Sequence, residues 1–121
     1  MDTAGLPLTG TCQLTTVGRR SGQERRVEIW YVVVDEQFVV TGTPGARDWL
    51  ANLREHPKAV LHLGSPQGDI AVTAYEVTDE ATRQRIVSEA WRLQPWYATQ
   101  PYTREDWVAV APMVTLGPTR T

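Results

Sequence analysis

Residues 26–34 contain the longest apolar run of the chain, and this segment constrains the fold more than any other. Its β-branched and aromatic residues are typical of a β-strand. The first residues alternate with charged ones, whereas Ile29–Val34 is apolar on both faces. The second half of this strand is therefore predicted to be buried on both sides. Asp35-Glu36 predicts a tight turn, and Gln37–Thr41 predicts the returning strand of a hairpin.

Further strands are predicted where β-branched residues recur between turn residues. These segments are Thr9–Val17, Ala59–Leu63, Asp69–Val77 and Val108–Leu116. Glycine-containing turns are predicted between strands at Gly18–Gln23 and Gly64–Gly68. Pro112 interrupts the last segment and predicts a sheet edge or a bulge there, because proline cannot donate to a strand ladder.

Two segments have a helical pattern. The first places apolar residues at i, i+3, i+4 and i+7, namely Ala46, Trp49, Leu50 and Leu53. Pro57 ends this helix, and Thr78 is the expected N-cap of the second one. Between the second helix and the last strand, Gln94–Tyr102 carries two prolines and three aromatic residues and is expected to be irregular.

The element order β-β-β-α-β-β-α-β predicts a mainly β fold with two helices, of the α+β class. Hairpin connections favour antiparallel pairing. About six strands in 121 residues favour a small barrel, which leaves few open edges. A chain of this length is expected to form a single domain over residues 1–121.

Composition argues against several classes of function. The net charge is −2 and the pI is about 5.6, so nucleic-acid binding is not expected. No apolar run is long enough for a membrane span, and no signal peptide is apparent. The single Cys12 excludes an internal disulfide framework and is consistent with the cytoplasm. No cysteines or histidines lie at metal-ligand spacing, so a metal site is not expected.

The turn between the first two strands is the best candidate for a binding site. Gly18–Arg26 contains glycines, one serine and four arginines. Glycines let backbone amides approach an anion, and guanidinium groups bind phosphate or carboxylate oxygens in a forked geometry. A hairpin turn with solvated surface charge is the alternative. Catalytic side chains are scarce elsewhere, so a bound cofactor is expected to supply any reactivity.

Aromatic residues give a second clue. The chain has five tryptophans and four tyrosines but one phenylalanine. Trp96, Tyr97 and Tyr102 gather in the irregular segment, where they could cover a flat ring system. The alternative is that they pack the open end of the barrel.

Two motifs in order resemble the deazaflavin-dependent nitroreductase and quinone reductase family. The first is Leu14–Gly22 followed by Arg25, and the second is Thr41–Trp49 followed by Asn52-Leu53, Pro57 and Val60. The resemblance implies a split β-barrel that binds coenzyme F420. This coenzyme has a flavin-like ring, a ribityl chain, a phosphate and a polyglutamate tail.

The resemblance also implies roles for individual residues. The phosphate and tail would meet Arg19, Arg20, Ser21 and Arg25. Backbone donors near the cofactor would come from Thr43, Gly45 and Ala46, and Asn52 matches a family position near it; a solvent-facing helix residue is the alternative for Asn52. The acceptor would lie against Trp96, Tyr97 and Tyr102, with Tyr97 or Tyr102 as proton donor.

The implied reaction is hydride transfer from reduced F420 to a small, flat, electron-poor acceptor such as a quinone, an enone or a nitroaromatic. An FMN- or haem-binding split barrel is one alternative. A protein that shares the fold without redox activity is another. Flavin-type split barrels often form dimers, so a homodimer is compatible with the sequence.

Overall fold

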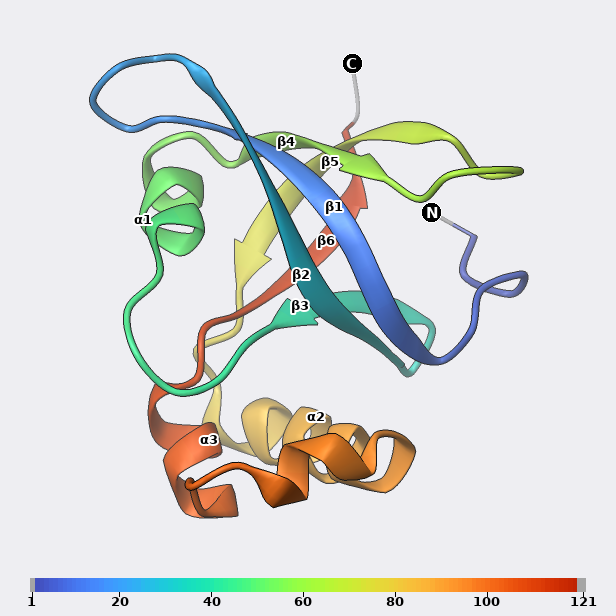
Figure 1. The fold of residues 1–121 in the computed structure, drawn as a ribbon, viewed down its shortest axis with the longest axis vertical. Coiled ribbons are helices and arrows are strands. Elements are labelled where there is room, and N and C mark those ends of the chain that lie inside the picture. The colour runs from blue at the N-terminus through green and yellow to red at the C-terminus, as the bar shows by residue number, and fades with distance from the viewer. Residues whose placement is uncertain (1, 120–121) are drawn as a thin grey trace.

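The computed structural model describes residues 2–119, and within them six strands form a closed barrel (Figure 1). The elements in chain order are β1 (Thr9–Val17), β2 (Glu24–Val34), β3 (Gln37–Thr41), α1 (Asp48–Glu55), β4 (Lys58–His62), β5 (Asp69–Glu76), α2 (Glu80–Leu93), the 3-10 helix η1 (Pro95–Thr99), α3 (Arg104–Val110) and β6 (Met113–Pro118). Neighbours around the barrel follow the order β1-β2-β3-β6-β5-β4, and β4 closes onto β1. Every pairing is antiparallel, so the predicted fold class is confirmed.

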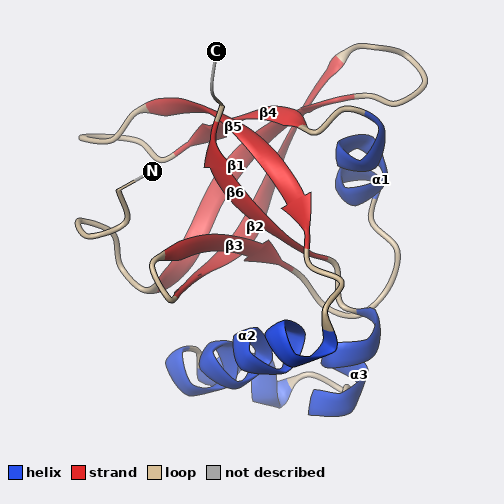
Figure 2. Ribbon diagram, turned by 180° about the vertical axis from the view of Figure 1, so that it is seen from behind, coloured by secondary structure: helices blue, strands red, loops and turns tan. Residues whose placement is uncertain are grey.

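The helices lie outside the barrel in two places. Helix α1 lies beside the barrel wall, near the β1–β2 turn (Figure 1). Helices α2 and α3 form a layer across one end of the barrel, and the view from behind shows the same arrangement (Figure 2). This separation places α1 next to the arginine-rich turn between β1 and β2 (residues 18–23), which we call the basic turn. It places the aromatic segment, residues 94–102, in the helical layer.

The packing of β2 explains why its second half is apolar on both faces. Tyr31 and Val33 belong to the barrel core, the buried cluster inside the barrel. Val32 and Val34 point the other way, into the helix-layer core between the barrel and α2, η1 and α3. The prediction of burial on both sides is therefore confirmed.

The first predicted helix is confirmed, with a shorter buried face. Trp49, Leu50 and Leu53 are buried against the barrel, and Pro57 follows the end of α1. Ala46 precedes the helix and is exposed. The predicted cap of α2 is wrong by one residue, because the Asp79 side chain accepts the hydrogen bond from the backbone N–H of Thr82 at 2.8 Å.

The predicted last strand, Val108–Leu116, is wrong in its first half. Residues 104–110 form helix α3, and Pro112 lies between α3 and β6 instead of inside a strand. A capping box starts the helix: the Thr103 hydroxyl accepts from Asp106 N–H at 3.1 Å, and the Asp106 carboxylate accepts from Thr103 N–H at 2.9 Å. Trp107 anchors α3 in the helix-layer core. Capping and burial therefore prevail over the β-propensity of the valines.

One buried arginine joins the helical layer. The Arg83 side chain on α2 is only 9% exposed and donates hydrogen bonds to backbone carbonyls. Its Nη1 contacts Val77 O at 2.8 Å, its Nη2 contacts Ala111 O at 2.6 Å and Trp107 O at 3.3 Å, and its Nε contacts Val108 O. Burial lowers the pKa of Arg83, and the charge of Glu76 opposes that shift. Arg83 thus holds the end of α3 against the start of α2.

None of the helices within residues 2–119 has both the length and the apolar character needed to span a bilayer.

Candidate functional site

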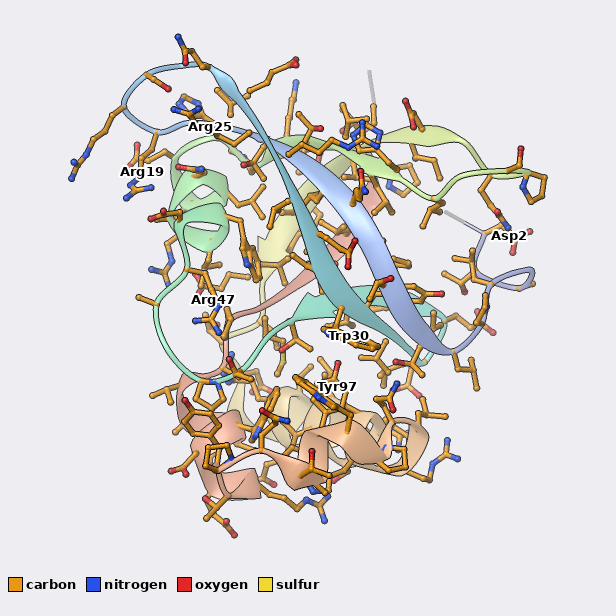
Figure 3. The ribbon with its side chains drawn as sticks, viewed as in Figure 1. Asp2, Arg19, Arg25, Trp30, Arg47 and Tyr97 are labelled. Atoms are coloured by element: carbon orange, nitrogen blue, oxygen red, sulfur yellow. The ribbon has the colours of Figure 1, made fainter. Side chains whose placement is uncertain are left out.

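A cleft of about 390 Å³ lies between the β1–β2 turn and α1. Its walls are Thr16, Gly18, Arg19, Arg20, Ser21, Arg25, Val27, Asp48, Trp49 and Asn52. Figure 3 shows Arg19 and Arg25 on this side of the molecule, near α1. The structure thus brings together five of the predicted cofactor residues: Arg19, Arg20, Ser21, Arg25 and Asn52. We call this cavity the basic cleft.

The turn that carries the arginines closes through its glycines. Gly18 N–H donates to Gln23 O at 2.8 Å, and Gly22 N–H donates back to Gly18 O at 2.9 Å. A Cβ on Gly18 would lie 2.6 Å from the Ser21 hydroxyl, so a side chain at this position would force Ser21 to move. That hydroxyl accepts from Gln23 N–H at 3.1 Å. Ser21 therefore shapes the turn in addition to lining the cleft.

Asn52 is a buried polar residue of α1 and connects the helix to this turn. Its Oδ1 accepts from the backbone N–H of Arg19 at 3.0 Å and from Arg19 Nη1 at 2.9 Å. Its Nδ2 donates to the Thr16 hydroxyl at 3.5 Å. The alternative that Asn52 faces solvent is wrong, because its side chain packs under the turn and is 5% exposed.

The charges of the basic cleft are unevenly paired. Arg19 Nη2 lies 3.5 Å from the Asp48 carboxylate, which is the acidic group of the cleft wall. Within residues 2–119, Arg20 and Arg25 have no ion-pair partner. The next arginine, Arg26, points out of the cleft and donates to Gln13 on β1. Unpaired guanidinium groups beside a cavity are suited to bind an anion.

The Thr43–Ala46 loop lies on the other side of the start of α1. Gly45 and Ala46 line a separate cavity with Arg47, whereas Asp48, the next residue, lines the basic cleft. Arg47 Nη2 donates to Thr43 O at 2.9 Å and Arg47 Nη1 to Ala46 O at 2.9 Å, which fixes the loop. The two cavities therefore flank the first turn of α1, and the loop residues do not line the basic cleft.

The aromatic segment lies away from the basic cleft. In Figure 3, Trp30 and Tyr97 lie between the barrel and the helical layer, far from Arg19 and Arg25. Trp96 stacks on Trp30 with ring centroids 5.6 Å apart and is 37% exposed. Tyr97 is fully buried in the helix-layer core, and burial raises the pKa of its phenol.

The tyrosines of this segment therefore differ in access to a ligand. The Tyr97 hydroxyl lacks a hydrogen-bond partner within the described part of the chain, and its ring packs at 5.0 Å from Trp107. Tyr102 is 38% exposed. The structure does not bring these residues to the basic cleft. Tyr102 is the tyrosine of the pair that a ligand can reach without rearrangement.

Four residues of the cleft wall lie outside the predicted site: Thr16, Val27, Asp48 and Trp49. Asp48 has no local signal, because its partner Arg19 is 29 positions away in the chain and only the fold brings them together. Trp49 is predicted as part of the buried helix face, yet it also contributes an apolar wall to the cleft. An acidic residue next to a buried tryptophan is common in helices, so the pair Asp48-Trp49 does not by itself indicate a cleft.

Solved structures share this fold at low sequence identity. An F420-H2-dependent reductase is 20% identical with a TM-score of 0.67, over 88% of this chain and 93% of that chain. A structure described as a domain-swapped dimer is also 20% identical with a TM-score of 0.67, over 88% and 79%. The heme storage protein HutZ from Vibrio cholerae is 14% identical with a TM-score of 0.66, over 92% and 82%. These likenesses establish the barrel fold.

The family assignment comes from the sequence itself. No curated protein matches the chain significantly. The model of the F420H2-dependent quinone reductase family matches residues 2–111 of the 121. This match spans both sequence motifs, the basic cleft and α1. The chain is therefore an F420-dependent oxidoreductase that belongs to the F420H2-dependent quinone reductase family.

Proposed function

We propose that this protein transfers a hydride from F420H2 to a small, flat, electron-poor acceptor, and that the basic cleft holds the anionic part of the coenzyme. The acceptor class comprises quinones, enones and nitroaromatics, with a quinone favoured by the family description. The observation that carries the proposal is the grouping of Arg19, Arg20 and Arg25 around one cavity beside α1.

The donors of the basic cleft match the chemistry of the coenzyme. A phosphate and a glutamate tail offer several negatively charged oxygens, and guanidinium groups bind such oxygens through paired hydrogen bonds. Arg20, Ser21 and Arg25 are exposed at the cleft, so a ligand reaches them without unfolding the turn. Val27 and Trp49 add apolar surface. The volume of about 390 Å³ suits one part of a long ligand, near the lower end for ligand pockets.

The ring end of the coenzyme would then extend past the first turn of α1 toward the Thr43–Ala46 loop. Support comes from the position of Asp48 and Arg47, which are neighbours in sequence and line the two cavities. Bound F420H2 supplies the hydride, so the residues of the chain bind and orient the reactants. Tyr102 and Trp96 remain the proposed acceptor-side residues, since both are exposed, while Tyr97 is buried in the helix-layer core.

A fluorescence titration with F420 tests coenzyme binding. The parent and an Arg25→Ala variant are compared with Arg26→Ala, a matched control whose arginine lies outside the cleft. Loss of one charge-assisted contact should raise the Kd of Arg25→Ala about ten-fold or more. Arg26→Ala should bind like the parent. A parent that binds FMN or haem but not F420 would overturn the proposal.

A second assay tests the acceptor. Purified protein with F420H2 is offered quinones, enones and nitroaromatics while deazaflavin absorbance is followed. Tyr102→Phe should lower kcat about 10²-fold if its phenol donates a proton. Tyr97→Phe removes a buried hydroxyl and should leave kcat unchanged. Turnover of none of the three acceptor classes would contradict the proposed reaction.

The proposal includes a homodimer. Its support is a structure of the same fold that is described as a domain-swapped dimer. Size-exclusion chromatography with light scattering measures the mass in solution. A mass near 13.6 kDa at all protein concentrations would exclude the dimer.

A further inference from the structure

Asn52 lies in the wall of the basic cleft, yet its amide is already engaged within the protein. Oδ1 accepts two hydrogen bonds from Arg19, one from the backbone and one from the guanidinium. Nδ2 donates to the buried Thr16 hydroxyl. A carbonyl oxygen has two lone pairs, so Oδ1 has no remaining capacity for a good hydrogen bond. Asn52 can therefore offer a ligand no acceptor and at most the second N–H of Nδ2.

The turn itself has few other attachments to the rest of the molecule. Its own hydrogen bonds join Gly18, Gly22 and Gln23 to one another and do not reach α1. The contacts that cross to α1 go through Arg19, to Asn52 and to the exposed carboxylate of Asp48. Since exposed ion pairs contribute little, the buried amide of Asn52 is the main tether between turn and helix.

The Arg19 guanidinium is in turn engaged by Asn52 and Asp48. One amino group of its guanidinium binds Asn52 and the other faces Asp48. Arg20 is exposed and follows Arg19 on the same turn, whereas Arg25 lies on β2, where it pairs with Thr16 of β1. The position of Arg20 over the cleft therefore depends on how the Arg19 backbone is held.

We propose that Asn52 is a positioning residue, which acts through Arg19 to hold Arg20 where it meets the anionic groups of the coenzyme. This inference rests on the proposed function of the basic cleft. It changes the role expected from sequence, because the main role of Asn52 is to orient Arg20 through Arg19. Pre-organised cations bind more tightly, because less conformational entropy is lost when the ligand arrives.

The first measurement needs no coenzyme. Hydrogen exchange of the Arg19 amide is followed by NMR in the parent and in Asn52→Leu. The Oδ1 contact at 3.0 Å should protect this amide, and its removal should speed exchange about ten-fold or more. Equal exchange rates at Arg19 in the two proteins would overturn the positioning role, whatever the protein binds.

The second measurement is a double-mutant cycle on the Kd for F420. Asn52→Leu and Arg20→Ala should each raise the Kd about ten-fold. If Asn52 acts by positioning Arg20, the double variant should bind only about as weakly as the weaker single variant, because the cation to be positioned is gone. An additive loss of about a hundred-fold in the double variant would overturn the inference, since the residues would then act independently.

A stability-matched control accompanies the cycle. Ile86→Ala opens the helix-layer core on α2, far from the cleft, and should lower the melting temperature without changing the Kd. Weaker binding by Ile86→Ala equal to that of Asn52→Leu would attribute the effect to general destabilisation and overturn the inference. Failure of the parent to bind F420 would instead overturn the proposed function and this inference with it.

Discussion

Replacing Arg83 by methionine should destabilise the protein strongly, although no carboxylate within residues 2–119 pairs with this arginine at hydrogen-bond distance. Methionine keeps most of the side-chain length and removes the donors. The Trp107 carbonyl keeps its hydrogen bond from Ala111 N–H at 3.1 Å. The carbonyls of Val77, Val108 and Ala111 lose the guanidinium.

The magnitude follows from those carbonyls. A buried acceptor left without a partner costs about 1–3 kcal/mol. Methionine buries apolar surface and the chain relaxes, so about 1 kcal/mol for each carbonyl gives a loss of about 3 kcal/mol. The free energy of unfolding of a domain of this size is about 5–15 kcal/mol, so the variant should remain folded at room temperature. Its melting temperature should fall by about 10 °C.

Chemical denaturation of two variants measures the loss. Arg85→Met carries the same substitution on the same helix, but Arg85 is exposed and pairs with Asp35 and Glu89 on the surface. Its midpoint should stay close to that of the parent. Arg83→Met should unfold at a clearly lower denaturant concentration with an unchanged slope. Equal midpoints for the two variants would refute the reasoning about the buried carbonyls.

Three further predictions concern charge and backbone strain. Asp48→Asn removes the carboxylate beside Arg19 and should tighten F420 binding about two- to five-fold in a low-salt titration; weaker binding would mean that Asp48 orients the cleft. Glu36 has φ 67°, so Glu36→Gly should raise the free energy of unfolding by about 0.5–1 kcal/mol, measured by denaturation. Hydrogen bonds from the Thr82 hydroxyl and amide hold the pKa of Asp79 below its usual value, so its contribution is lost as pH falls through that pKa. Melting temperatures of Asp79→Asn should therefore fall less than those of the parent on acidification, and parallel curves would contradict this.

The barrel could be predicted from sequence because its strands carry local signals. Apolar residues on both faces of β2 and the Asp35-Glu36 turn specify a hairpin that must be covered on each side. Helix α3 could not be predicted in the same way. Val108 and Val110 favour a strand locally, and the burial of Trp107 that stabilises the helix depends on residues elsewhere in the fold.

In the candidate site, too, the residues of one continuous segment could be predicted, whereas contacts between distant segments could not. The basic turn and the start of β2 form one continuous segment, so Arg19, Arg20, Ser21 and Arg25 could be proposed together from their order. The contact between Arg19 and Asn52 spans 33 positions, so no local pattern indicates that the amide is used inside the protein. The burial of Tyr97 likewise results from packing among Trp91, Trp96 and Trp107.

Strand β6 has a consequence for how the protein is made. It pairs with β3 on one side and β5 on the other, yet it follows both in the chain. During synthesis, β3 and β5 therefore emerge with open edges before the strand that joins them. Open edges pair with any compatible strand nearby, including β6 of another copy. The nascent chain is thus most exposed to misassembly just before residues 113–118 appear, and crowding on a polysome increases that exposure.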